Sequence, residues 1–125
     1  MSNNTYWNKR IESFKYAFNG IRILFKSTPN AILELVIAGI AILLGIFFKI
    51  SIIEWVAIWI LIGLVFGLEA VNSAMETLSD YSCKREINPD IKKVKDLSAG
   101  GVLIAAIVSV VVGILIFLPK IINLF

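Results

Sequence analysis

The chain has 125 residues, of which 58% are hydrophobic, and its mean hydropathy is +0.87. This composition excludes an ordinary soluble domain and indicates an integral membrane protein. The net charge of +3 comes from cations that flank apolar segments. We therefore attribute this charge to orientation in a membrane, and we expect no nucleic-acid partner.

The N-terminal segment, residues 6–27, has the pattern of an amphipathic helix. Six apolar residues recur at spacings of three and four, namely Trp7, Ile11, Phe14, Phe18, Ile21 and Phe25. Polar and charged residues lie between them, so we expect this helix to lie on the membrane surface. Thr28 and Pro29 then end the helix, because proline lacks a backbone donor and restricts its predecessor. Asn30 is placed to cap the helix that follows.

Three apolar stretches are long enough to cross a hydrocarbon core of about 30 Å as helices: residues 31–48, 52–80 and 97–118. The expected fold is therefore an all-α integral membrane protein, with one surface helix and three transmembrane helices in a single domain. Residues 81–96 form the expected loop between the second and third spans. Within this loop, Asn88-Pro89-Asp90 has the pattern of a helix start, so we expect the third helix to begin before the membrane.

Lysine and arginine residues predict the orientation of the chain. Ten of them flank two of the spans, namely Lys9, Arg10, Lys15, Arg22, Lys26, Lys84, Arg85, Lys92, Lys93 and Lys95. Only Lys49 and Lys120 lie elsewhere. By the positive-inside rule, the N-terminus and the 81–96 loop face the cytoplasm and the C-terminus faces outward. At the outer interface, Glu54 lies beside Trp55, and we interpret Glu54 as a solvated anchor within an aromatic belt.

Glu69, Asn72 and Glu76 lie inside the second apolar stretch. Their spacing of i, i+3 and i+7 puts them within about 60 degrees of one another on one helix face. A carboxylate at the centre of a membrane helix costs about 2.5 to 3.5 kcal/mol on insertion scales, so such residues usually have a function. We interpret this polar stripe as a functional site.

The residue types restrict the chemistry of that site. The chain has no histidine, a single cysteine (Cys83) and no GxxxxGK[ST] motif. These absences exclude a Ser-His-Asp triad, a histidine- or thiolate-based zinc site within one chain, and a P-loop. Carboxylates, an amide and lysines remain, and they suit magnesium-dependent phosphoryl transfer. The residues that supply these groups are Glu69, Asn72, Glu76, Asp80, Lys95 and Asp96.

The sequence Glu69-Ala-Val-Asn72-Ser-Ala-Met-Glu76, with Asp80 and Lys95-Asp96-Leu-Ser-Ala after it, resembles the prokaryotic diacylglycerol kinase family, including its undecaprenol kinase branch. The resemblance covers nearly the whole chain. It implies a small membrane kinase of the bacterial cytoplasmic membrane that transfers the γ-phosphate of ATP, with Mg²⁺, to a lipid alcohol. It also implies a homotrimer with sites between subunits. The acceptor stays open between diacylglycerol and undecaprenol, because pockets for apolar tails discriminate weakly.

The resemblance assigns an expected role to each polar residue. Glu69 is the expected general base, Glu76 a magnesium ligand, and Asn72 supports both. The expected nucleotide-binding residues are Lys95, Asp96, Lys9, Tyr16 and Asp80. The family commonly has an acid, a second metal ligand, where this chain has Thr28. The resemblance then implies weaker metal binding, or recruitment of Glu34, Glu12 or water in its place.

Three alternatives stand beside the kinase interpretation. Buried glutamates also bind protons and cations in small oligomeric proton-coupled transporters. The acids would otherwise hold subunits together in a non-catalytic assembly protein, and Lys95 and Asp96 would then be an ordinary surface ion pair. Thr28 leaves a catalytically inactive relative as the third alternative.

Overall fold

The structure is a computed structural model that describes residues 2–84, 86 and 88–125, with side chains from residue 5 onward. The described residues form four helices: α1 (Ser2–Ser27), α2 (Pro29–Phe47), α3 (Ile52–Cys83) and α4 (Pro89–Leu124). Helices α2, α3 and α4 are each long and apolar enough to cross a membrane. The predicted all-α fold with three candidate membrane spans is therefore confirmed.

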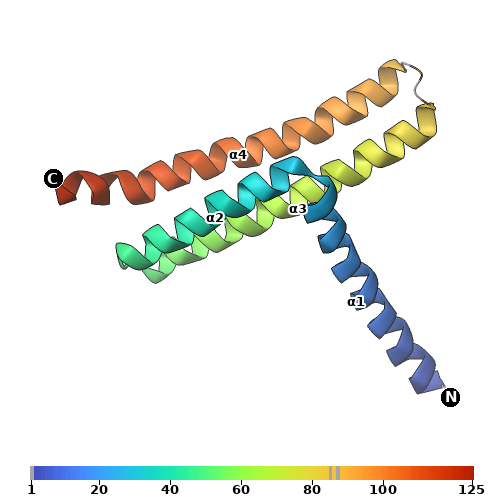
Figure 1. Ribbon diagram of the computed structural model, residues 1–125, viewed down its shortest axis with the longest axis horizontal. Coiled ribbons are helices and arrows are strands. Elements are labelled where there is room, and N and C mark those ends of the chain that lie inside the picture. The colour runs from blue at the N-terminus through green and yellow to red at the C-terminus, as the bar shows by residue number, and fades with distance from the viewer. Residues whose placement is uncertain (1, 85, 87) are drawn as a thin grey trace.

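Helices α2, α3 and α4 run alongside one another, whereas α1 leaves them at its junction with α2 (Figure 1). Both α2 and α4 pack against α3. The C-terminal end of α1 also contacts α3, because the Phe25 ring packs on the Phe66 ring with their centroids 5.6 Å apart. The apolar residues earlier in α1, such as Trp7 and Phe14, are exposed. This exposed apolar face fits the predicted position of α1 on a membrane surface, which stays a prediction.

Helix α2 begins two residues earlier than a cap at Asn30 requires. Thr28 is the N-cap residue, with an extended backbone and no capping hydrogen bond from its side chain, and Pro29 occupies the first helical position. Proline is well suited to that position, because the N–H it lacks would have had no partner within the helix. The predicted capping role of Asn30 is therefore wrong.

The connection between α3 and α4 is shorter than the predicted 81–96 loop. Helix α3 continues through Cys83 and ends at Lys84, which adopts a left-handed conformation with φ 46°. Helix α4 already begins at Pro89, so most of the predicted loop is helical. Arg85, one of the cations used to predict orientation, lies outside the described residues.

The predicted start of α4 is confirmed. The side-chain oxygen of Asn88 accepts hydrogen bonds from the backbone N–H groups of Asp90 and Ile91, at 2.9 and 3.4 Å. These bonds satisfy two of the donors that a helix start leaves without partners. The helix therefore extends about two turns beyond the apolar stretch that spans the membrane.

Glu54 connects α3 to α4 at the predicted outer end. Its carboxylate accepts hydrogen bonds from the backbone N–H and hydroxyl of Ser51, at the start of α3. It also accepts a 2.6 Å hydrogen bond from Nζ of Lys120 in α4, and the Glu54 side chain is only 25% exposed. The interpretation of Glu54 as a solvated anchor is therefore wrong, because its carboxylate forms a partly buried ion pair between helices.

The outer end also holds the best-packed apolar cluster, which contains Ile50, Ile58, Ile116 and Phe117. Gly45 of α2 lies beside it, against the ring of Trp55. A Cβ atom added to Gly45 would lie 2.7 Å from Cη2 of Trp55. Glycine therefore permits the close approach of α2 to α3 at this end.

We predict that Gly45→Ala lowers the stability of the fold by about 1 to 3 kcal/mol, because the new methyl group overpacks the contact with Trp55. Thermal unfolding in detergent micelles measures this change. Gly39→Ala is the matched control, since a Cβ atom at Gly39 meets nothing within 4 Å. Equal unfolding midpoints for the two variants would contradict the prediction.

Candidate active site

A pair of carboxyl groups lies between α2 and α3. Glu69 of α3 is 2% exposed, although it carries a carboxyl group within an apolar helix. The carboxyl group of Glu34, in the second turn of α2, interacts directly with that of Glu69. The two helices run in opposite directions (Figure 1), so the beginning of α2 meets the second half of α3. Glu34 therefore lies beside Glu69, and its predicted recruitment to metal binding stays a prediction.

Three oxygen atoms in this region are buried and have no hydrogen-bond partner in the part of the chain that the structure describes: Oε2 of Glu34, Oε2 of Glu69 and Oδ1 of Asn72. A buried acceptor without a donor costs free energy. Two adjacent carboxylates also repel each other strongly in a medium of low dielectric constant. The pair therefore needs a proton, a cation or a hydroxyl donor.

The polar face of α3 continues toward the predicted cytoplasmic end. Glu76 lies about 10 Å along the helix axis from Glu69, and it is exposed. One turn further, Asp80 accepts a 2.7 Å hydrogen bond from Nζ of Lys95, which joins α3 to α4. Asp96 pairs instead with Lys92, at 2.7 Å. The alternative of a Lys95–Asp96 ion pair is therefore wrong.

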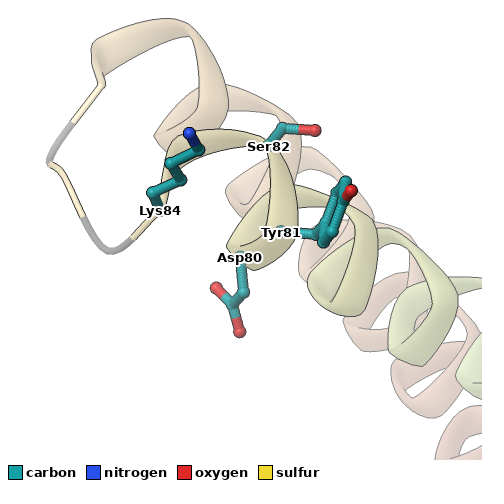
Figure 2. Close-up of a pocket in the computed structure, with 4 residues that line it drawn as sticks. All are labelled: Asp80, Tyr81, Ser82 and Lys84. Carbon is teal, nitrogen blue, oxygen red and sulfur yellow. The ribbon is translucent and has the colours of Figure 1, made fainter.

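A hollow of about 660 Å³ surrounds the last turn of α3 and is lined by Asp80, Tyr81, Ser82 and Lys84. The four side chains spread around the helix and do not converge on one point (Figure 2). The hollow is therefore an open surface at the end of α3 and does not form an enclosed site.

The predicted residues of α1 lie away from the carboxyl pair of their own chain. Lys9, Glu12 and Tyr16 are all exposed, and Tyr16 is 71% exposed. They belong to the part of α1 that leads away from the other helices (Figure 1). Thr28 is half-buried at the start of α2, about 9 Å along the helix axis before Glu34. Of the predicted site residues, a single chain therefore brings together only those of α2, α3 and α4.

The oxygen donors suit a magnesium ion that arrives with a nucleotide. Within the described ranges, no group of three or more His, Cys, Asp or Glu side chains is placed to hold a metal ion. Magnesium usually binds through one or two carboxylates and takes its other ligands from substrate phosphates and water. The exposed carboxylate of Glu76 and the partnerless oxygen of Asn72 are hard donors of this kind. The residues present therefore fit magnesium bound to a nucleotide.

The family model for prokaryotic diacylglycerol kinase matches residues 15–117, which is most of the chain. The chain belongs to the prokaryotic diacylglycerol kinase family. This membership makes it a lipid kinase, which is a transferase, and a multi-pass membrane protein. The resemblance inferred from the sequence is confirmed.

Two relatives carry names that describe a lipid kinase. The undecaprenol kinase of Bacillus subtilis (strain 168) is 36% identical over 113 residues, which cover 90% of this chain and 91% of that protein. The diacylglycerol kinase of Synechocystis sp. (strain ATCC 27184 / PCC 6803 / Kazusa) is 31% identical over 115 residues, covering 90% of this chain and 64% of that protein. The two names specify different acceptor lipids.

Proposed function

We propose that this lipid kinase transfers the γ-phosphate of ATP, bound as its magnesium complex, to the hydroxyl group of diacylglycerol or undecaprenol. The observation that carries the proposal is the pair of half-buried Glu34 and buried Glu69, whose Oε2 atoms are buried and have no partner in the described structure. A lipid hydroxyl supplies the missing donor at the depth where a membrane lipid can reach it. The names of the two relatives supply the two candidate acceptors.

Glu69 is the proposed general base. A base must lie within hydrogen-bond reach of the hydroxyl that it deprotonates, and Oε2 of Glu69 is a buried acceptor without a hydrogen-bond partner among the described residues. As the proton moves to the carboxylate, the lipid oxygen forms a bond to the γ-phosphorus. The bond from that phosphorus to the β,γ-bridging oxygen breaks, and ADP leaves with the electron pair. Glu34 fixes the carboxyl of Glu69 from α2, and Asn72 presents an amide one turn away.

Glu76, Lys95 and Asp96 are the proposed groups for the nucleotide. Glu76 would hold magnesium, which neutralises phosphate charge when it is bound. Lys95 supplies a cation at the cytoplasmic end, where the Asp80 carboxylate positions it at 2.7 Å. Asp96 holds Lys92 in the same region. Since Thr28 has no carboxylate, the ion would rely on Glu76 and on the phosphates themselves.

The proposed assembly is a homotrimer in which α1 serves a neighbouring subunit. Lys9 and Tyr16 are exposed on the part of α1 that leads away from its own α3 (Figure 1). Their proposed roles beside the nucleotide therefore require a second chain. Glu12 belongs to the same segment, so it would also reach only a neighbouring site. The family's implied sites between subunits agree with this arrangement.

The proposed orientation places the N-terminus and the α3–α4 connection in the cytoplasm. This orientation brings Glu76, Asp80 and Lys95 to the side where ATP is present. It also follows from the distribution of cations along the chain. The C-terminus then lies outside the bacterial cytoplasmic membrane.

We predict that Glu69→Gln lowers phosphate transfer at least about 100-fold, because general-base catalysis typically contributes that much. Glu76→Gln is expected to raise the magnesium concentration needed for half-maximal rate. The measurement is transfer of ³²P from labelled ATP to each lipid alcohol by purified protein.

Glu86→Gln is the matched control for these variants, since Glu86 is an exposed acid near the start of α4 with no proposed role. Size-exclusion chromatography in detergent checks that every variant keeps its oligomeric state. Full activity in Glu69→Gln would contradict the role of Glu69. Proton flux without phosphate transfer would favour a transporter, and loss of assembly in the acid variants would favour a scaffold. Absence of both activities in the intact wild-type oligomer would favour an inactive relative.

We predict that Cys83, the partly exposed thiol at the end of α3, reacts with a membrane-impermeant maleimide only from the cytoplasmic side. Inside-out vesicles should therefore label, whereas right-side-out vesicles should not. Lys49→Cys in a Cys83→Ser background is the control for the outer side, because residue 49 lies in the turn between α2 and α3. This variant should label in right-side-out vesicles and not in inside-out vesicles. The reverse labelling pattern would contradict the proposed orientation.

A further inference from the structure

The carboxyl pair and Asn72 present buried oxygen atoms that lack donors. The atoms are Oε2 of Glu34, Oε2 of Glu69 and Oδ1 of Asn72, and none has a hydrogen-bond partner among the described residues. The carboxyl groups of Glu34 and Glu69 interact directly, and Glu69 is only 2% exposed. Asn72 follows Glu69 by three residues, so it lies on the same face of α3, about 4.5 Å further along the axis. This part of the bundle therefore gathers acceptors and supplies no donor for them.

A proton or a hydroxyl group satisfies these acceptors incompletely. A proton on the carboxyl pair supplies one hydrogen-bond donor, and an alcohol hydroxyl also supplies one. Even if both are present, one of the oxygen atoms stays buried without a partner, which costs free energy. A cation contacts several oxygen atoms at once, so a bound cation satisfies the whole group.

We propose that Glu34, Glu69 and Asn72 bind a monovalent cation, Na⁺, between turnovers. The ligands are two carboxyl groups and one amide carbonyl, all of them oxygen donors. One Na⁺ ion and one proton kept by the pair balance the two negative charges, so the buried site is neutral. The ion must leave before an alcohol hydroxyl reaches Glu69. Na⁺ therefore competes with the acceptor lipid, and this competition, unlike the binding of Na⁺, rests on the proposed function.

The surroundings of the pair favour an ion that loses its water. Ile37 and Ala38 follow Glu34 by one helical turn, and Phe66 precedes Glu69 by one turn. All three apolar residues line the same groove as Glu34. Magnesium dehydrates reluctantly and keeps several water molecules, which apolar walls cannot hold by hydrogen bonds. A monovalent cation holds its water less tightly, so it fits this site better than magnesium does.

The polar face of α3 offers the ion a route from the cytoplasmic end. Along this face the side chains become steadily more buried, from exposed Glu76 through half-buried Asn72 to buried Glu69. A cation that enters at Glu76 thus meets an oxygen atom at each turn of the helix. The site therefore has both a set of ligands and an entry path.

Equilibrium dialysis of the purified full chain against ²²Na⁺ tests the site without any catalysis. The protein is held in detergent micelles without magnesium or nucleotide, and N-methylglucamine keeps the ionic strength constant. The expected result is one saturable Na⁺ site per chain. Glu69→Gln and Asn72→Leu should each raise the Kd for Na⁺ about tenfold or more, because each removes an oxygen ligand or its charge. Absence of saturable binding to the wild-type protein would overturn the proposal.

Glu76→Gln is the matched control for binding, since Glu76 is an exposed acid on the same helix face. This variant should keep the wild-type Kd for Na⁺. Loss of binding in Glu76→Gln, with binding retained in Glu69→Gln, would overturn the proposal, because the ion would then lie at the exposed end of α3. Size-exclusion chromatography checks that each variant is folded. If Glu69→Gln does not fold, an unchanged Kd in Asn72→Leu overturns the proposal by itself.

Kinetics of the wild-type protein test the competition. When Na⁺ replaces N-methylglucamine at constant ionic strength, the KM for the lipid alcohol should rise about twofold at the Na⁺ concentration that equals the Kd from dialysis. The kcat and the KM for ATP should stay unchanged. An unchanged KM for the lipid alcohol would overturn the competition. Saturable Na⁺ binding without phosphate transfer to either alcohol would overturn the proposed function and leave the cation site in place.

Discussion

The contact between the buried carboxyl of Glu69 and the half-buried side chain of Glu34 is the interaction that constrains the candidate site. Glu34 and Glu69 face each other inside helices that are apolar enough to span a membrane, and each keeps one carboxyl oxygen without a partner in the described chain. Such a contact is unfavourable unless a proton, a cation or a donor arrives. A lipid hydroxyl is one such donor, and a base that receives its proton relieves the same repulsion. The repulsion between the two carboxyl groups thus explains both the cost of burying them and the proposed transfer of a proton to Glu69.

Under the proposed function, the helix geometry separates two substrates that differ in solubility. Glu76 and Asp80 follow Glu69 along one face of α3, so a single helix leads from the buried acids to the exposed end of the bundle. Lys95 approaches the exposed end from α4, because α4 begins well before its apolar stretch. In the proposed reaction, the water-soluble nucleotide and the lipid approach this face from opposite ends.

The sequence was sufficient to predict those features of the fold that depend on residues close to one another in the chain. The three spans and the helix start at Asn88 follow from hydropathy and capping, and the stripe from Glu69 to Glu76 follows from helical spacing alone. Contacts between helices were harder to predict from the sequence, because they depend on how one helix is aligned along another. Hydropathy could not show that Lys95 pairs with Asp80, or that Glu54 pairs with Lys120 across 66 positions. The error at Asn30 was local, since Pro29 took the first helical position.

Reaction with a hydrophobic carbodiimide is the most direct measurement of the central claim. This reagent modifies protonated carboxyl groups in apolar surroundings, and mass spectrometry locates the adduct. The account predicts one adduct per chain, at Glu34 or Glu69, with loss of phosphate transfer in proportion to modification and protection by the lipid alcohol. An adduct confined to Glu76 or Asp80, or modification of the pair with full retention of activity, would contradict it.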